Sequence, residues 1–139
     1  MVQLIVGEKG KGKTKVLLDK VNKEIKSING NVVYLDKSSE HMFELNNKIR
    51  LIDVCEYNIA NADQFIGFVT GIISQDHDLE QMYLDCLMKI ANIDSDGIVP
   101  LITDINKVSE AFKVDFIVSV TMDSGNIPSE LKDMVIEAL

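Results

Sequence analysis

The sequence contains few of the residues that build disulfide-linked or metal-binding scaffolds. Its 139 residues include two cysteines, two histidines and no tryptophan. Cys55 and Cys86 lie in apolar runs without C-x-x-C spacing, so we expect buried free thiols in a reducing compartment. His41 and His77 stand apart, at no metal-ligand spacing, which is typical of solvated loop histidines. Neither residue type therefore predicts a structural metal site.

Long hydrophobic runs and an excess of positive charge are also missing. No apolar run approaches the ~20 residues that span a bilayer, and Met1 leads straight into an apolar segment without a basic leader. The net charge of −8 argues against a dominant nucleic-acid surface. The length and a hydrophobic fraction of 46% suit one domain with its own core. We expect a soluble, cytoplasmic protein that forms a single domain over residues 1–139.

A complete phosphate-binding pattern, G-x-x-x-x-G-K-[ST], stands near the start of the chain. An apolar run precedes it and an amphipathic segment follows it, which is the strand, loop and helix order that this motif requires. The candidate nucleotide-binding residues are Gly7, Glu8, Lys9, Gly10, Lys11, Gly12, Lys13 and Thr14.

The chemistry of this loop follows from its residue types. Glycines let successive backbone N–H groups curl around an anion, and the helix that opens at Lys13 adds its positive dipole end. Lys13 would reach the β- and γ-phosphates of a nucleotide, and the Thr14 hydroxyl would enter a Mg²⁺ shell of waters and phosphate oxygens. Lys9 and Lys11 would help to attract the nucleotide.

Strand and helix patterns alternate along the chain, which predicts an α/β fold. A mostly parallel sheet of about five strands, with helices on both faces, is the architecture that this alternation indicates. The short strand at 50–55 could lie at the sheet edge, and the polar stretch 38–47 could hold a helical turn. The expected strands cover residues 2–6, 31–36, 50–55, 79–87 and 115–120, and the expected helices cover residues 13–28, 62–74, 98–113 and a last segment from about 128.

A magnesium-nucleotide site needs a carboxylate at the end of a buried strand to hold the metal, usually through water. Asp36, Asp53 and Asp85 each follow or end an apolar run. We favour Asp85 as the metal residue, because its strand has helices on both sides and lies well after the loop. Asp36 could contact the attacking water or the ribose, and Asp53 is expected to be structural.

Hydrolysis also needs a residue that orients or deprotonates water. No glutamate follows Asp85, because Cys86 occupies that position. Glu40 and Glu56 are the substitutes, and we take Glu40 as the candidate base.

Charge on the transferring phosphoryl group is often stabilised by an arginine. Arg50 is the only arginine, so a finger from this chain, or from a neighbouring copy, would have to be Arg50. Otherwise a lysine or a partner protein would have to supply this positive charge. Ser119 and Thr121 end a later strand, where a hydroxyl could sense the γ-phosphate.

The loop Gly-x-x-Gly-x-Gly-Lys-Thr resembles that of the P-loop NTPase superfamily, in its RecA-like branch. Residues 81–86 look like the metal-positioning strand of that branch, and residues 114–121 look like its sensor strand. The resemblance implies the three-layer α/β/α P-loop NTPase fold with bound Mg²⁺ and ATP. The chain also looks similar to small uncharacterised ATP-binding proteins of low-GC Gram-positive bacteria, some labelled twitching-motility ATPase-like. RecA-like cores usually carry a fifth strand beside the first, whereas this pattern predicts a final helix and an open edge there.

Three functions remain open. The first is a slow ATPase that hydrolyses the β–γ phosphate bond. ATP is favoured over GTP because residues 106–109 lack the aspartate of the guanine-reading motif. The second is a non-catalytic switch or adaptor that binds nucleotide and signals to a partner, either a second copy or another protein. The third is a small-molecule kinase of the thymidine-kinase type, disfavoured because the chain has no cysteine-rich zinc lobe.

Overall fold

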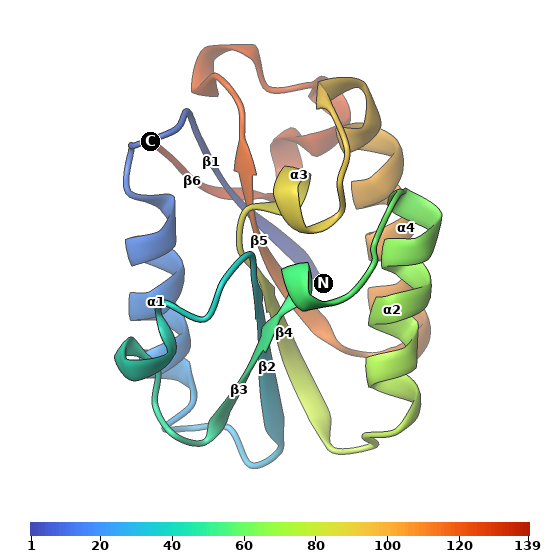
Figure 1. Ribbon diagram of the computed structural model, residues 1–139. Coiled ribbons are helices and arrows are strands. Elements are labelled where there is room, and N and C mark those ends of the chain that lie inside the picture. The colour runs from blue at the N-terminus through green and yellow to red at the C-terminus, as the bar shows by residue number, and fades with distance from the viewer.

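Six parallel strands form one sheet in the computed structural model, which describes residues 1–139 (Figure 1). The spatial order is β3-β2-β4-β5-β1-β6, and every neighbouring pair is parallel. The strands are β1 (Val2–Gly7), β2 (Asn31–Asp36), β3 (Ile49–Asp53), β4 (Leu79–Leu84), β5 (Asp115–Thr121) and β6 (Val135–Ala138).

Helices cover both faces of this sheet. α1 (Lys13–Glu24) packs alone on one face, and the other face carries α2 (Ala62–Ser74), the short α3 (Leu87–Ile90) and α4 (Ile98–Phe112), as Figure 1 shows. Two hydrophobic clusters follow from these layers. The smaller lies under α1 around Ile5, Tyr34 and Tyr83, and the larger lies under α2 and α4 around Leu4, Phe65 and Ile102. The predicted three-layer α/β/α arrangement is confirmed.

Most predicted elements are present, with shifted ends. α2 covers the predicted residues, and β3 lies at the sheet edge as expected. α1 ends at Glu24 rather than at residue 28, and a 3-10 turn occupies Met42–Glu44. The predicted strand 79–87 stops at Leu84, and the chain turns at Cys86 into α3, which the periodicity did not indicate.

The expected final helix is wrong. The segment forms a 3-10 helix at Ser129–Met134 and then β6, which pairs in parallel with β1. An edge strand exposes unpaired backbone N–H and C=O groups, and pairing with β1 satisfies them. The Leu139 N–H, for example, donates to the Val6 carbonyl at 2.8 Å. β1 is therefore an interior strand, and the expected open edge beside it does not exist.

Two expectations about single side chains are also wrong. Cys55 is exposed, because β3 ends at Asp53 and the 3-10 turn Val54–Glu56 carries the thiol to the surface; Cys86 is half-buried. His41 is not freely solvated, since its side chain is only 23% exposed and lies between Glu40 and Glu44.

We expect Leu131 to hold the C-terminal segment against the core. Leu131 is 1% exposed within the larger cluster, so Leu131→Ala should lower the free energy of unfolding by about 2–5 kcal/mol. Ile136 lies in β6 of the same segment and is 46% exposed, so Ile136→Ala should cost less than about 1 kcal/mol. Urea unfolding of the two variants measures both values, and equal losses would contradict this account of the segment.

Candidate functional site

The carboxyl ends of β1, β2, β4 and β5 meet at one edge of the sheet. Gly7 pairs in register with Thr121, while Asp36 and Asp85 stand at or just beyond the ends of β2 and β4. Parallel sheets bind ligands at this edge, where the strands end and helices begin. The predicted loop and the predicted carboxylates are thus brought together by the topology.

The loop has the backbone that its glycines permit. Gly10 and Gly12 adopt φ of +83° and +93°, values that a side chain would strain, and Gly12 precedes the first residue of α1. Gly7 is constrained differently: an added Cβ would lie 3.1 Å from the Leu139 Cβ, so the chain after β6 packs against the start of the loop. A helix N-terminus and a glycine-rich turn together form an anion-binding cradle.

Lys13 lies inside this cradle. Its side chain is mostly buried, and its ammonium donates to the Glu8 carbonyl of the same loop at 2.9 Å. Burial lowers the pKa of Lys13, and the nearby Cys86 and Asp85 partly counteract that effect. The lysine therefore sits in the loop with only a carbonyl as a direct partner, an arrangement that suits an incoming phosphate.

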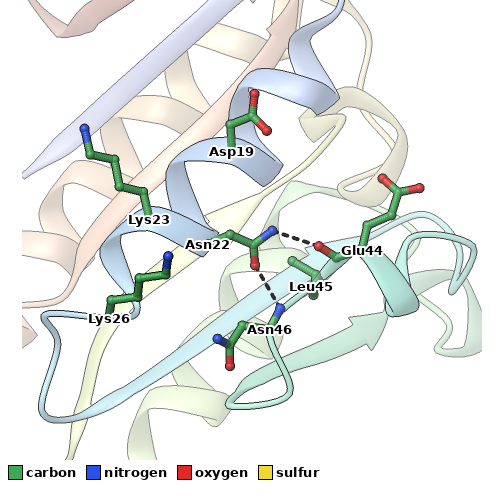
Figure 2. Close-up of a pocket in the computed structure, with 7 residues that line it drawn as sticks. All are labelled: Asp19, Asn22, Lys23, Lys26, Glu44, Leu45 and Asn46. Carbon is green, nitrogen blue, oxygen red and sulfur yellow. Dashed lines mark hydrogen bonds between the residues drawn. The ribbon is translucent and has the colours of Figure 1, made fainter.

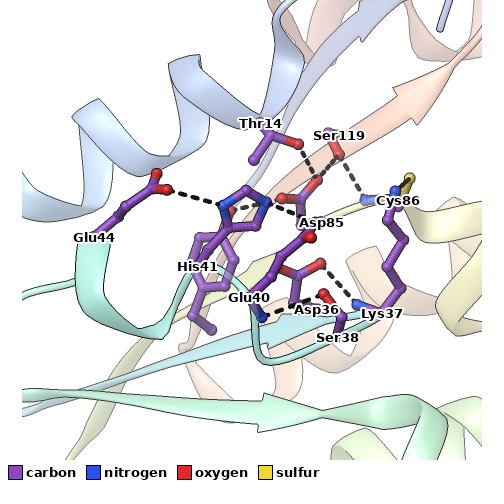
Figure 3. A network of polar contacts seen from close by, with 11 residues as sticks. Thr14, Asp36, Lys37, Ser38, Glu40, His41, Glu44, Asp85, Cys86 and Ser119 are labelled. Carbon is purple, nitrogen blue, oxygen red and sulfur yellow. Dashed lines mark hydrogen bonds and ion pairs between the residues drawn. The ribbon is translucent and has the colours of Figure 1, made fainter. Parts of the chain in front are cut away.

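Asp85 is the centre of a hydroxyl network (Figure 3). Its carboxylate is 2% exposed and accepts three hydrogen bonds. The Tyr34 hydroxyl donates at 2.8 Å, the Ser119 hydroxyl at 3.0 Å and the Thr14 hydroxyl at 3.2 Å. Burial, together with the adjacent Asp85 charge, raises the pKa of Tyr34 well above its ordinary value, so this phenol remains a neutral donor.

The Thr14–Asp85 contact joins the two halves of the predicted magnesium site. Mg²⁺ prefers oxygen ligands and usually keeps several water molecules in its coordination shell. No group of three or more His, Cys, Asp or Glu side chains forms a protein cage anywhere in the chain. An adjacent hydroxyl and carboxylate therefore fit a magnesium ion that takes its other ligands from phosphate and water.

Asp36 is buried more deeply than its place at the end of an apolar run indicated. It is 1% exposed, and its Oδ1 accepts the Lys37 N–H at 2.7 Å, but its Oδ2 has no hydrogen-bond partner. Burial, followed by the charge of Asp85, raises the pKa of Asp36 to about 6. A buried carboxylate oxygen without a donor, beside a second buried carboxylate, is an unsatisfied polar group of a kind that is found at functional sites.

Glu40, the residue favoured as base, is placed differently. Its side chain is 64% exposed, and its carboxylate pairs with His41 Nε2 at 3.4 Å. His41 Nδ1 faces the Glu44 carboxylate at 3.5 Å, so the histidine bridges two glutamates (Figure 3). Asp36, by contrast, is 1% exposed and interacts electrostatically with Asp85.

The segment 37–48 that carries these residues is fastened to α1. Figure 2 shows Asn22 on α1 donating to the Glu44 carbonyl and accepting from the Asn46 N–H, both at 2.8 Å. The cavity between α1 and this segment has a volume of about 470 Å³ and is lined by both acidic and basic side chains, Asp19, Lys23, Lys26 and Glu44 among them. The amide nitrogen and the amide oxygen of Asn22 both make these hydrogen bonds. The contact therefore positions the segment and does not offer Asn22 to a ligand.

The remaining candidates either line the pocket at the loop or lie away from it. Thr121 and Cys86 line this pocket, which has a volume of about 170 Å³ and which we call the phosphate pocket. Cys86 has a left-handed backbone with φ of +63°, a strain of about 1–3 kcal/mol for a non-glycine residue, and its N–H donates to the Ser119 hydroxyl at 2.8 Å. Asp53 accepts from the Cys55 N–H in a turn, as a structural residue does, while Glu56 is exposed. Arg50 is exposed on β3, separated from β1 by β2, β4 and β5.

Comparison with known proteins establishes the fold. No protein-family model matches the chain, and no curated protein matches it. Among solved structures, a KaiC-like protein from the hyperthermophilic archaeon Pyrococcus horikoshii superposes with a TM-score of 0.65 at 15% identity. The match covers 93% of this chain and 66% of the archaeal protein, just under two thirds of its length. The likeness confirms the α/β fold with its parallel sheet and, at this identity, shows the fold alone. No helix of this chain has the length and apolar character that crossing a membrane requires.

Asp36 should make stability depend on pH. Its pKa rises from an ordinary 3.8 to about 6 on folding, so between these values the folded chain binds more protons than the unfolded chain. The free energy of unfolding should therefore fall as pH rises through that window, by up to about 3 kcal/mol. Asp36→Asn should flatten this slope and stabilise the chain at pH 7–8. The matched exposed change Glu137→Gln should leave the slope intact in urea unfolding at a series of pH values, and an unaltered slope in Asp36→Asn would contradict the assignment.

Proposed function

We propose that residues 1–139 form a single nucleotide-binding domain that binds Mg-ATP and hydrolyses its β–γ phosphate bond slowly. One observation carries the proposal: the loop threonine and the strand-end carboxylate, 71 residues apart, meet at 3.2 Å beside the buried loop lysine. A glycine-rich turn that matched the motif by chance would not be expected to face a buried carboxylate. The RecA-like fold supports the same reading.

Each residue of the site has a role in this proposal. Backbone N–H groups of the loop and the Lys13 ammonium would hold the β- and γ-phosphates, in place of the Glu8 carbonyl that Lys13 now contacts. Thr14 and Asp85 would hold the magnesium ion, which supplies charge neutralisation at the phosphate oxygens. Lys37 also lines the pocket. Because Arg50 lies too far from the pocket within one chain, Lys37 is the cation that would stabilise charge on the transferring phosphoryl group.

Asp36 is the base that we favour for hydrolysis. The oxygen of a water molecule would bond to the γ-phosphorus while the bond from that phosphorus to the bridging oxygen breaks, releasing ADP and phosphate. The proton lost by the water would pass to Asp36 Oδ2, which has no other partner. A pKa of about 6 leaves this carboxylate mostly ionised at pH 7 yet more basic than an ordinary aspartate.

A nucleotide-dependent binding switch is the second candidate function. It is favoured by the position of Arg50 on the far edge strand, which leaves no arginine at the phosphate pocket. Without that charge, turnover by P-loop proteins is slow, because an arginine finger contributes roughly 10³–10⁵ in rate. A switch would bind Mg-ATP with the same residues, and a partner, either a second copy or another protein, would respond to the bound state.

Lys13 provides the test of nucleotide binding. In a calorimetric titration with Mg-ATP, Lys13→Ala should lose about 100-fold or more in affinity, because a buried charge-assisted contact is removed. Lys11→Ala, an exposed lysine of the same loop, should lose less than about tenfold. Chelating the magnesium should weaken binding to the unaltered chain. Equal affinity in a folded Lys13→Ala variant would remove the proposal, and a wild-type chain that binds without continuing heat release would identify the switch.

Asp36 and Glu40 form a matched pair for the identity of the base. Asp36→Asn should lower the steady-state rate of phosphate release by about 10²–10⁴ while Mg-ATP affinity changes only a few-fold, because proton transfer is lost and binding is not. Glu40→Gln should keep the rate within about threefold, since its carboxylate lies at the surface. The reverse pattern, with Glu40→Gln inactive and Asp36→Asn active, would assign the base to Glu40.

A further inference from the structure

A second cavity lies beside the phosphate pocket. It has a volume of about 320 Å³, in the range of small-molecule sites, and its outer wall is formed by Met88, Lys89 and Ile93. The residues that line both cavities are Lys9, Lys37, Cys86 and Thr121. The two cavities are therefore neighbours along a shared wall, and the nucleotide chemistry described above uses none of the residues that line the outer cavity alone.

The charge of this second cavity is opposite to that of the chain. Three lysines line it and no carboxylate does, although the protein carries a net charge of −8. Lys9, Lys37 and Lys89 each lack a carboxylate within 4.0 Å; the one polar partner among them is the Cys86 thiol, 3.8 Å from the Lys37 ammonium. Unpaired ammonium groups around a concave surface attract and hold anions.

The apolar part of the wall is held in place by the core. Leu87 and Ile90 of α3 are 0% and 1% exposed, so this short helix is anchored on its inner side. Met88 on the same helix and Ile93 are half-buried at the cavity. The Ile93 N–H donates to the Met88 carbonyl at 3.0 Å. The left-handed turn at Cys86 directs the chain into this arrangement (Figure 3 shows Cys86 beside Lys37). A preformed apolar wall that faces lysines suits a ligand with an apolar body and an anionic group.

We propose that this cationic pocket, lined by Lys9, Lys37, Cys86, Met88, Lys89, Ile93 and Thr121, binds a small organic anion while the loop holds its nucleotide. The ligand is a carboxylate or phosphate ester with a compact apolar body. Its anionic group contacts the lysines and its apolar body packs on Met88 and Ile93. Simultaneous binding of a nucleotide rests on the proposed function, whereas binding of the anion to this pocket does not.

The probe for this site is 8-anilinonaphthalene-1-sulfonate, an apolar ring system with one anionic group. Its fluorescence should rise saturably at one site per chain, and the uncharged N-phenyl-1-naphthylamine should bind at least about tenfold more weakly. Lys89→Gln should weaken the sulfonate probe by about five- to tenfold, because one charge-assisted contact is lost. Lys107→Gln, at an exposed lysine on α4, is the matched control and should have no effect.

The two cysteines locate the bound probe. Saturating sulfonate probe should slow the alkylation of Cys86 by iodoacetamide at least about fivefold while leaving the exposed Cys55 unchanged, as measured by mass spectrometry of the two peptides. Equal protection of both thiols, no protection of Cys86, or equal binding of the charged and uncharged probes would overturn the proposal.

Two further arms separate this pocket from the nucleotide site. Lys13→Ala should retain probe binding even though it loses Mg-ATP, so failure of one proposal leaves the other standing. Rising Mg-ATP should shift the apparent Kd of the probe to a plateau, because both ligands can be bound at once. A Kd that rises without limit would show direct competition for the phosphate pocket and would overturn the second site.

Discussion

The buried carboxylate of Asp85 is the interaction on which the site depends. It accepts from Thr14 at the start of α1, from Tyr34 on β2 and from Ser119 on β5, and so connects three elements to the end of β4. A buried carboxylate is tolerated only when hydrogen bonds replace its hydration, which fixes the rotamers of all three hydroxyl side chains. The end of the loop at Thr14 is thereby tied to the end of β4 by a single charged group.

A second carboxylate close to the first gives the site its electrostatic character. Asp36 and Asp85 are both almost fully buried, and the charge of Asp85 contributes to the raised pKa of Asp36. Lys13 is buried beside them, with its pKa lowered by the same loss of solvent. Such a cluster is less stable than an apolar core of the same size, and groups of buried ionisable side chains of this kind are typical of functional sites.

Local patterns identified the loop and Asp85 because both are encoded in a few consecutive residues. The loop motif is continuous, and Asp85 directly follows an apolar run, so each could be found without knowledge of the fold. Tyr34 and the depth of Asp36 could not be found this way. Their importance arises from the order β2-β4-β5, which places side chains from three distant strands around one carboxylate. The sequence favoured Glu40 over Asp36 as the base, whereas the fold buries Asp36 and leaves Glu40 at the surface.

The chain by itself determined the alternation of strands and helices and the glycine-rich turn, and it predicted the ligand class, because glycine conformations and hydrophobic periods are local properties. Tertiary structure decided the C-terminal strand, the short helix after Cys86 and the choice between carboxylates. Residues 131–138 carry a helical spacing, yet the last four pair with β1, since the unpaired backbone of that strand offers more stabilisation than an isolated terminal helix would provide. Pairing between residues more than 120 positions apart leaves no trace in a local pattern.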